Sequence, residues 1–357
     1  MRRALTHARR GLGRTTPNPV VGACVVTAEG VVVGDGAHER AGGPHAEVNA
    51  LDAAGTLARG STLYCTLEPC AHRGHRRTGP CTERIIAAGI TRVVAAVADP
   101  YPRVNGRGFE MLRAHGISVT VGVAADEASR LNRAYLTSMR LHRPWVIAKV
   151  AVSADGYVSA APGVRTDLTS VPARRHAQRV RASVDAVAVG SETVLVDDPE
   201  LTVRDVYRAR PLTRVIFDRR LRTPATAAVL RSRAAGPVLI LTSPEALSEQ
   251  ADHARTLESR GATVIPVATG RVLDGLRAIS AYDVQSVVVE GGPTLHAACW
   301  DEGVVDQVHV YVAPTVIGPR GVCWGSDIML TLSANTRLRA QAIGRDVFMD
   351  GYVHRAD

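Results

Sequence analysis

The sequence predicts a two-domain α/β protein, and three observations support this prediction. The chain has 357 residues, which is enough for two domains that each bury a hydrophobic core. Short apolar runs alternate with helix-like segments along the chain, which is typical of α/β domains. This alternation is interrupted at 130–143, where a connecting helix ends at Pro144, and then begins again. We therefore expect one domain over residues 1–143 and a second over residues 144–357.

The first domain is predicted to contain a sheet covered by helices. Residues 20–33 predict a β-hairpin with its turn at Glu29 and Gly30. Predicted helices cover 46–58, 82–88 and 109–115, and predicted strands cover 61–66, 91–98 and 118–123. Strands that alternate with helices in this way indicate a three-layer α/β domain.

The second domain repeats the same alternation. Predicted strands cover 145–152, 186–189, 213–218, 238–242, 263–266 and 286–289. Predicted helices cover 173–183, 246–260 and 272–280 and fall between these strands. The pattern indicates a second α/β domain with its own sheet.

The composition excludes several classes of protein. Apolar residues make up 46% of the chain and charged residues 22%, as in ordinary globular enzymes. No apolar run reaches the roughly 18 residues needed to cross a bilayer, and the first residues lack the apolar core of a secretion signal. Six cysteines in a chain of this length are too few for a disulfide scaffold. We therefore expect a cytoplasmic protein with no membrane partner.

The charge is strongly positive but does not predict a nucleic-acid partner. The net charge is +9, yet the basic residues are spread along the chain and only 4% of residues are aromatic. Almost all of the positive charge is arginine, and Lys149 is the only lysine. A lysine retained among so many arginines suggests a position that a guanidinium cannot serve.

Four residues of the first domain form the pattern of a hydrolytic zinc site. His45 and Glu47 stand at the start of the predicted helix 46–58, and Cys70 and Cys81 each follow a proline. One imidazole and two thiolates suit zinc and leave a fourth position for water, whose pKa the metal lowers. Glu47, two residues from the histidine, can face that position and relay the proton, as in zinc deaminases. We therefore predict zinc ligands His45, Cys70 and Cys81, with Glu47 as the catalytic acid and base.

Two other interpretations of this pattern remain open. The zinc site would be structural if the three ligands only tied the chain together, but Glu47 would then have no role. A nucleic-acid deaminase would also use this motif, but it needs a basic, aromatic surface for a single strand. The chain differs from nucleic-acid deaminases in its few aromatic residues, and its second domain would have no purpose in such an enzyme.

At this point the sequence resembles a known family, the bifunctional deaminase–reductases of riboflavin biosynthesis. In the first half the matching segments are 16–22 (TPNPVVG), His38, 45–47 (HAE) and 63–72 (LYCTLEPCAH), with Gly74 and Thr78 in the long loop between the cysteines. The resemblance implies a cytidine-deaminase-like fold. It also implies that Asn18 and His38 contact the substrate.

The second half resembles the reductase of this family, which implies a dihydrofolate-reductase-like fold and the cofactor NADPH. The matching segments are 149–156 (KVAVSADG), 190–204 (GSETVLVDDPELTVR) and 289–295 (VEGGPTL). The resemblance implies a catalytic Lys149. The implied cofactor contacts are Thr193, Asp197, Gly291 and Gly292, and the implied substrate contacts are Arg181, Leu201, Arg204 and Glu290. Bare amides after a strand and guanidinium groups both suit phosphate.

Four positions of the second half depart from the family pattern. A serine and a tryptophan of the pattern are Arg165 and Asp167, a further serine is Arg219, and a lysine is Thr315. An acidic group in place of an aromatic ring removes a stacking surface beside the cofactor. Two functions therefore remain open: the complete bifunctional enzyme, or a paralogue of a specialised pathway whose reductase domain is repurposed or inactive.

The expected reactions follow from the resemblance. The first domain would hydrolyse the 2-amino group of a diaminopyrimidinone ribosyl phosphate and release ammonia, using Zn²⁺. The second would use NADPH to reduce the ribosyl group to a ribityl group. The expected partner is this small-molecule pyrimidine, and the resemblance implies a homodimer or homotetramer.

Overall fold

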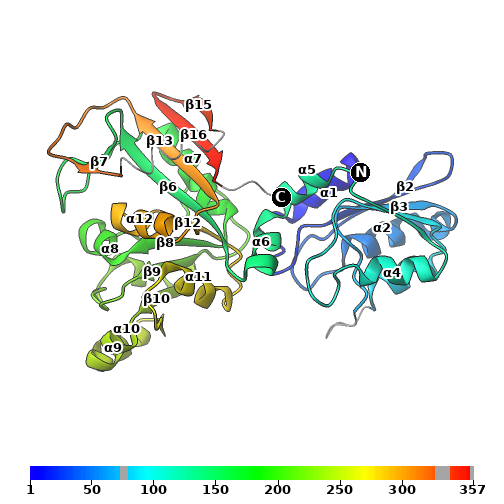
Figure 1. Cartoon of the computed structure of the whole chain (residues 1–357), viewed down its shortest axis with the longest axis horizontal. Helices are drawn as coiled ribbons and strands as arrows, with labels where there is room; N and C mark the ends of the chain where they lie inside the picture. The colour runs from blue at the N-terminus through cyan, green and yellow to red at the C-terminus, as the bar shows by residue number, and fades with distance from the viewer. Residues whose placement is uncertain (73–78, 326–337, 354–357) are drawn as a thin grey trace. The chain divides into compact units, whose positions relative to one another are not determined.

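The chain folds into two compact units, Met1–His142 and Arg143–Asp357 (Figure 1). The computed structural model describes residues 1–72, 79–325 and 338–353. Each unit has its own sheet and its own hydrophobic core, so both are α/β domains as predicted. Within the described residues, no helix has both the length and the apolar character required to cross a membrane.

The first unit is built on a five-stranded sheet with the order β2-β1-β3-β4-β5. Its strands are β1 (Gly22–Val26), β2 (Val32–Ala37), β3 (Thr62–Cys65), β4 (Arg92–Ala95) and β5 (Ser118–Val121). Its helices are α1 (Arg2–Ala8), α2 (Ala46–Ala54), α3 (Cys81–Ala87), α4 (Arg107–Ala114), α5 (Ala125–Leu131) and α6 (Arg133–Leu141). The predicted hairpin is the antiparallel pair β1 and β2, while β3, β4 and β5 run parallel.

Glycines on β1 and β2 allow helices to pack closely on both faces of this sheet. A Cβ on Gly22 would lie 2.0 Å from the carbonyl oxygen of Ala4 in α1. A Cβ on Gly36 would lie 2.0 Å from the carbonyl oxygen of Ala46 in α2. Gly36 pairs with the residue after Gly22, so the two glycines face opposite sides of the sheet. The helix on each side confirms the predicted three layers.

The helices of the first unit differ from the prediction in three places. Helix α1 was not predicted, because two arginines, a threonine and a histidine occupy four of its seven positions. The predicted helix 46–58 stops at Ala54, where Gly55 takes a positive φ of 55°, and continues as a 3₁₀ turn. The predicted connecting helix 130–143 corresponds to the end of α5 and the whole of α6, which are separated by Asn132. The Asn132 side chain bonds the backbone N–H and carbonyl of Val20, which holds it outside both helices.

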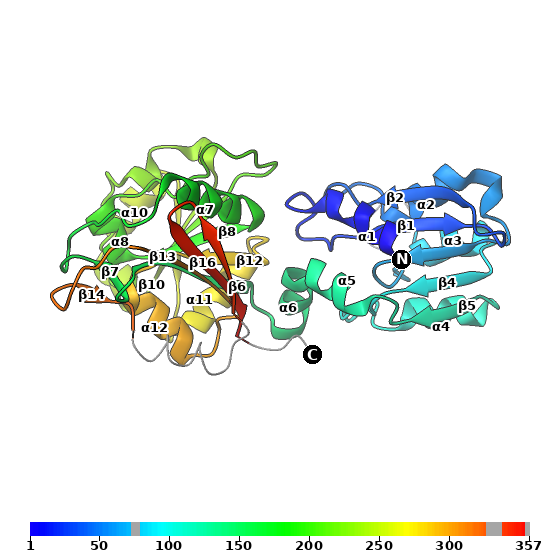
Figure 2. The ribbon, with the colours of Figure 1, turned by 90° about the horizontal axis from the view of Figure 1, so that it is seen from above.

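The second unit is built on a nine-stranded sheet with the order β11-β10-β9-β8-β12-β6-β13-β16-β15. Figure 2 shows this unit from above, with β6, β12, β13 and β16 among the labelled strands. The strands are β6 (Trp145–Ser153), β8 (Ala186–Gly190), β9 (Thr213–Phe217), β10 (Val238–Thr242), β11 (Ala262–Pro266), β12 (Ser286–Val289), β13 (Gln307–Ala313), β15 (Arg339–Ile343) and β16 (Asp346–Tyr352). The helices are α7 (Val171–Ser183), α8 (Ser191–Asp197), α9 (Pro244–Glu249), α10 (Ala251–Ser259), α11 (Val272–Ser280) and α12 (Pro293–Asp301). Strands β7 (Tyr157–Ser159) and β14 (Val322–Cys323) form a separate two-stranded sheet.

The strands from β13 onward add to the predicted pattern. In the order of the sheet, the seven strands from β11 to β13 run parallel. Strand β16 pairs antiparallel with β13, and β15 pairs antiparallel with β16 at the edge of the sheet. Charged residues interrupt the apolar pattern of β15 and β16, because β15 is exposed along most of its length and β16 is only partly buried. The predicted helix 246–260 is two helices separated at Gln250, whose side chain donates to the carbonyl of Arg220.

The two faces of the larger sheet have different characters. Valines of β6 pack with α11 and α12 in the main apolar core. On the other face, α7 covers Tyr311 of β13 and Phe348 of β16. Lys149 is paired in register with His309 of β13 and lies on the face that α7 covers. Polar side chains therefore gather between α7 and the sheet.

Candidate functional site

The three predicted metal ligands converge because each lies next to the start of a helix or the end of a strand. His45 is the N-cap residue of α2, and Cys81 is the first residue of α3. Cys70 lies in the segment that follows β3, and its carbonyl accepts a hydrogen bond from the backbone N–H of Thr82 at 3.2 Å. The loop between the cysteines includes Gly74 and Thr78, which lie outside the described residues.

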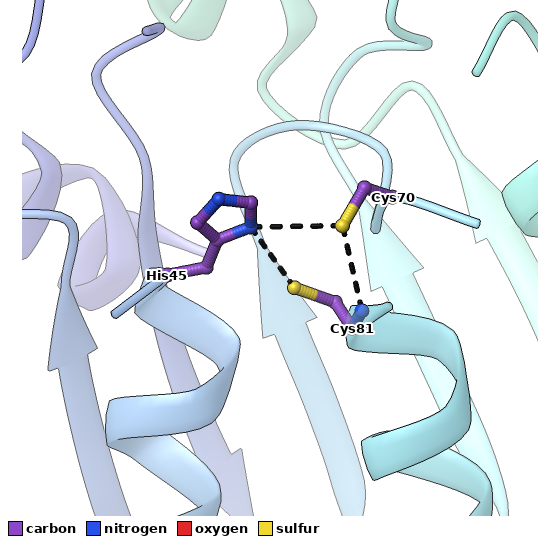
Figure 3. Close-up of side chains that lie close together, drawn as sticks. All are labelled: His45, Cys70 and Cys81. Carbon is purple, nitrogen blue, oxygen red and sulfur yellow. Dashed lines mark hydrogen bonds between the residues drawn. The ribbon is translucent and has the colours of Figure 1, made fainter. Parts of the chain in front are cut away.

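The ligand atoms form a compact group (Figure 3). His45 Nδ1 lies 3.2 Å from Cys81 Sγ and 3.6 Å from Cys70 Sγ. All three donor atoms lie within 4.8 Å of one another. Nitrogen and sulfur ligands on one tetrahedral zinc ion would be about 3.5 Å apart. The donor set and its spacing therefore fit zinc, and a fourth ligand position would remain for water.

The electrostatics of the cluster favour a bound cation. A hydrogen bond with Cys81 and the proximity of His45 lower the pKa of the Cys70 thiol to about 4, against the effect of burial. The resulting thiolate is the form that ligates zinc. Glu47 is buried in the first turn of α2, and burial raises its pKa to about 7. Its carboxyl interacts with His45 and with both thiols, which places it beside the cluster.

Asn18 and His38, which the resemblance implies as substrate contacts, lie together next to the metal cluster. The His38 ring packs edge-on to the His45 ring with centroids 5.4 Å apart. His38 Nδ1 lies 2.8 Å from the carbonyl oxygen of Pro44, and Nε2 lies 3.0 Å from Asn18 Nδ2. The carbonyl can only accept, so Nδ1 carries the proton and Nε2 accepts from the Asn18 amide. His38 thereby fixes the orientation of Asn18.

In the second unit, Lys149, Arg181 and Glu290 form one buried charged cluster. Arg181 makes a two-pronged contact with Glu290, through Nε at 2.7 Å and Nη2 at 2.9 Å. Lys149 Nζ lies 3.5 Å from Glu290 Oε2. The register explains the contact, because Val289 at the end of β12 pairs with Ala148 of the adjacent β6. Lys149 and Glu290, the next residues on their strands, therefore point to the same side of the sheet.

The charges of this cluster stabilise the Glu290 carboxylate. Burial alone would raise the pKa of Glu290, but the charges of Arg181 and Lys149 outweigh it and lower the pKa to about 2. Arg181 also donates from Nη1 to the carbonyl of Thr202 at 2.9 Å. Tyr311 was not predicted as a member of this site, yet Lys149 Nζ lies 5.6 Å from the centre of its ring. The alternation of polar and apolar residues along β13 was the signal that could have identified it.

The implied cofactor contacts lie on two helices that begin at neighbouring strand ends. Helix α8, which carries Thr193 and Asp197, follows β8, and α12 follows β12 through Gly291 and Gly292. Because β8 and β12 are adjacent and parallel, both helices start at the same edge of the sheet. A Cβ on Gly292 would meet no atom within 4 Å, so open space adjoins this backbone. Burial raises the pKa of the Asp197 carboxyl.

Leu201 and Arg204 belong to a loop that is bonded to α7. Leu201 is buried and takes a positive φ of 54°. The backbone N–H of Arg204 donates to Gln178 Oε1 at 2.9 Å, while the Arg204 side chain is exposed. Among the described residues, the Arg204 guanidinium has no carboxylate partner in an ion pair. Arg208 donates to the carbonyls of Arg181 and Ala182, which joins the same loop to the last turn of α7.

The four departures from the family pattern lie at exposed positions. The side chains of Arg165 and Asp167 are 63% and 73% exposed, and Arg165 Nη2 lies 3.5 Å from Asp167 Oδ1. The two replacements carry opposite charges, and they shift the pKa of Asp197 in opposite directions. Arg219 is exposed, and Thr315 is exposed with its carbonyl bonded to the N–H of Ala154. None of these side chains is buried against the cluster of Lys149, Arg181 and Glu290.

Two family models match the chain, one in each unit. The cytidine and deoxycytidylate deaminase zinc-binding region matches residues 1–97. The RibD C-terminal domain matches residues 144–349. The two matches agree with the metal cluster of the first unit and the parallel sheet of the second.

Similar proteins match over nearly the whole chain. The riboflavin biosynthesis protein RibD of Aquifex aeolicus is 41% identical over 318 residues, which cover 89% of this chain and 87% of that protein. The RibD of Escherichia coli is 40% identical over 339 residues, with 90% and 89% covered.

Solved structures of similar proteins share the fold of the whole chain. RibD of Acinetobacter baumannii has a TM-score of 0.86 at 34% identity, with 99% of this chain and 98% of that chain covered. The diaminohydroxyphosphoribosylaminopyrimidine deaminase/5-amino-6-(5-phosphoribosylamino)uracil reductase of Thermotoga maritima has a TM-score of 0.83 at 32% identity, with 99% and 97% covered. These matches confirm the predicted fold of a cytidine-deaminase-like domain followed by a dihydrofolate-reductase-like domain.

Proposed function

The chain belongs to the RibD family of riboflavin biosynthesis proteins, and we propose that its two units divide the two reactions of that family between them. The protein is a bifunctional enzyme, a zinc-dependent deaminase and an NADPH-dependent reductase of riboflavin biosynthesis. We assign the deaminase to residues 1–143 and the reductase to residues 144–357, which differs by one residue from the division of the two units between His142 and Arg143. The observation that carries this assignment is the convergence of His45, Cys70 and Cys81 beside the buried Glu47 in the first unit.

In the deaminase, His45, Cys70 and Cys81 would hold zinc. When bound, zinc lowers the pKa of a water molecule and so supplies the hydrolytic nucleophile near neutral pH. Glu47 would take the proton from this water and deliver it to the departing amine. Water and the 2-amino substrate thereby become ammonia and the 2-oxo product. Glu47 is suited to this relay because it lies beside the ligands without being one of them.

Asn18 and His38 would bind the pyrimidine next to the metal. The Asn18 side chain offers both a donor and an acceptor, which suits the edge of a pyrimidinone ring. His38 would act mainly by orienting the Asn18 amide, since both of its ring nitrogens have bonding partners in the protein.

In the reductase, Lys149 would provide a proton to the sugar group that is reduced. NADPH, when bound, supplies the hydride. Glu290 would hold the Lys149 ammonium in place, and Arg181 would hold Glu290 as a carboxylate. Two cations and one anion leave one positive charge in excess, which favours an anionic substrate.

The exposed Arg204 is the best candidate for the substrate phosphate. Its guanidinium can bind phosphate through two hydrogen bonds, whereas Arg181 is already committed to Glu290. Leu201 would contact the substrate from the same loop. Thr193, Asp197, Gly291 and Gly292 would bind NADPH, with the open space beside Gly292 available for its phosphates.

The remaining assignments concern the assembled protein. We propose that it works in the cytoplasm as a homodimer or homotetramer on a small-molecule pyrimidine ribosyl phosphate, without a nucleic-acid or membrane partner. No observation favours the specialised paralogue, and the residues that suggested it, Arg165, Asp167, Arg219 and Thr315, all lie at exposed positions.

The test follows both products in one reaction. The purified protein receives the diaminopyrimidinone ribosyl phosphate with NADPH, and ammonia release and NADPH oxidation are recorded together. Both signals are expected in sequence. A Lys149→Met variant should release ammonia but oxidise no NADPH. An Arg210→Gln variant serves as a matched control, because the one ion pair of its side chain among the described residues is a 3.7 Å contact with Asp185. Ammonia without NADPH oxidation in the unmodified protein would reject the reductase assignment.

A further inference from the structure

Glu68 is a buried carboxylate that the proposed chemistry does not use. It stands two residues before Cys70 in the segment after β3, and only 3% of its surface is exposed. Among the described residues, no basic side chain forms an ion pair with it. A buried carboxylate without a cation needs other donors, because an unpaired buried charge is strongly destabilising.

Three backbone amides supply these donors. Glu68 Oε1 accepts from the N–H of Gly108 at 2.9 Å, and Oε2 accepts from Gly106 at 2.9 Å and Asp99 at 3.2 Å. Gly106 is the N-cap residue of α4, and Gly108 lies in the first turn of that helix. Glycine has no side chain with which to cap the helix, so Glu68 provides the cap from another element.

The backbone next to Glu68 lies directly against α4. A Cβ on Gly108 would lie 2.1 Å from the carbonyl oxygen of Pro69, the residue between Glu68 and Cys70. Any residue larger than glycine would therefore force α4 away from this segment. The first turn of α4 therefore packs directly against the Pro69 backbone.

Cys70 itself is attached to α3. The Thr82 N–H donates to the Cys70 carbonyl at 3.2 Å, and the Thr82 hydroxyl oxygen lies 3.3 Å from the same carbonyl oxygen and 3.2 Å from Met111 Sδ. The Cys70 backbone is thus bonded to α3, and Glu68, two residues before it, is bonded to the start of α4. Without the Glu68 carboxylate, the hydrogen bonds to α3 would remain, but the link to α4 would be reduced to the packing of Gly108 against the Pro69 carbonyl.

We propose that Glu68 is a positioning residue for the metal site, because it anchors the Cys70 ligand to the N-terminus of α4. The proposal rests on the proposed zinc site. Glu68 acts through geometry, since its charge is satisfied by amides that belong to the scaffold. Groups that orient a metal ligand commonly contribute about 10- to 100-fold to metal affinity.

The test is the zinc affinity of a Glu68→Gln variant of the full chain, measured by competition with a chelating dye. The carboxamide has the same shape, but its NH₂ group would face backbone N–H donors and could not accept from them. The expected result is a fall in zinc affinity of about 10- to 100-fold, with faster amide exchange over residues 99–110. Excess zinc should restore ammonia release, and NADPH oxidation with the deaminated substrate should not change.

The control is Asp52→Asn, which removes a surface carboxylate of the same unit that pairs with Arg84. It should leave zinc affinity within twofold of the unmodified protein. If Glu68→Gln prevents folding, Gly108→Ala replaces it, since the added Cβ displaces α4 while the carboxylate remains. Unchanged zinc affinity in the folded variant would overturn the proposal. Zinc binding without ammonia release in the unmodified protein would instead reject the proposed function.

Discussion

Acid should destabilise the second unit through one buried histidine. His296 of α12 is 2% exposed. The carbonyl of Val289 lies 3.0 Å from Nε2, so Nε2 carries the proton, and Nδ1 accepts from the indole N–H of Trp324 at 2.9 Å. A second proton on Nδ1 would meet the indole N–H and break that bond. Burial accordingly lowers the pKa of His296 to about 4.

The magnitude follows from the difference between the folded and unfolded pKa values. Unfolded histidine has a pKa near 6.5, so the unfolded chain gains a proton before the folded chain does. The stabilisation is therefore fully present above pH 6.5 and is lost as the pH falls towards 4. Between pH 7.5 and pH 5.0 the loss is about 2 kcal/mol of the free energy of unfolding.

The assay is urea unfolding followed by tryptophan fluorescence. The chain has three tryptophans, Trp145, Trp300 and Trp324, and all belong to the second unit, so loss of zinc from the first unit does not enter the signal. A His296→Gln variant keeps one donor and one acceptor but cannot gain a proton. Between pH 7.5 and pH 5.0 the unmodified protein should therefore lose about 2 kcal/mol more of its free energy of unfolding than this variant does.

The control is His115→Gln, which lies in the first unit and should leave the fluorescence transition unchanged at both pH values. Equal losses in the unmodified protein and the His296→Gln variant would refute the reasoning.

Three further predictions concern the two sites. Glu47→Gln should lower ammonia release by about 10²- to 10⁴-fold and leave the zinc content unchanged, as measured by metal analysis; retained activity would remove Glu47 from the mechanism. Arg181→Met leaves the buried Glu290 without its main partner, so the free energy of unfolding of the second unit should fall by about 3–5 kcal/mol in the fluorescence assay. A loss below about 1 kcal/mol would show that Lys149 alone suffices. Removing zinc with a chelator should abolish ammonia release but not NADPH oxidation with the deaminated substrate, and loss of both activities would contradict separate sites.

The metal cluster could be predicted from sequence because its geometry is local. His45 and Cys81 each begin a helix, and Cys70 follows a strand, so short segments already specify where each ligand lies. Glu47 could be predicted for the same reason, because it lies in the first turn of the helix that follows His45. Glu68 was visible only as part of a motif, since its three bonding partners lie more than 30 residues further along the chain.

The second cluster could not be predicted from spacing. Lys149, Arg181 and Glu290 meet because β12, a late strand, inserts between β8 and β6. Strand order depends on packing between distant segments, which periodicity does not report. The resemblance identified these residues individually, but the two-pronged contact of Arg181 with Glu290 became clear only from the structure.

Because Lys149 is the only lysine, proteolysis at this residue can report how often the second unit unfolds locally. Lys149 lies in the middle of β6, between β12 and β13, and its side chain is 18% exposed. A protease that cuts only after lysine therefore has one target, inside a central strand that must leave the sheet before it can be cut. Cleavage into fragments 1–149 and 150–357 would measure how often the second unit opens. Bound ligands that protect this unit could be ranked by the same cleavage rate, without any label or substitution.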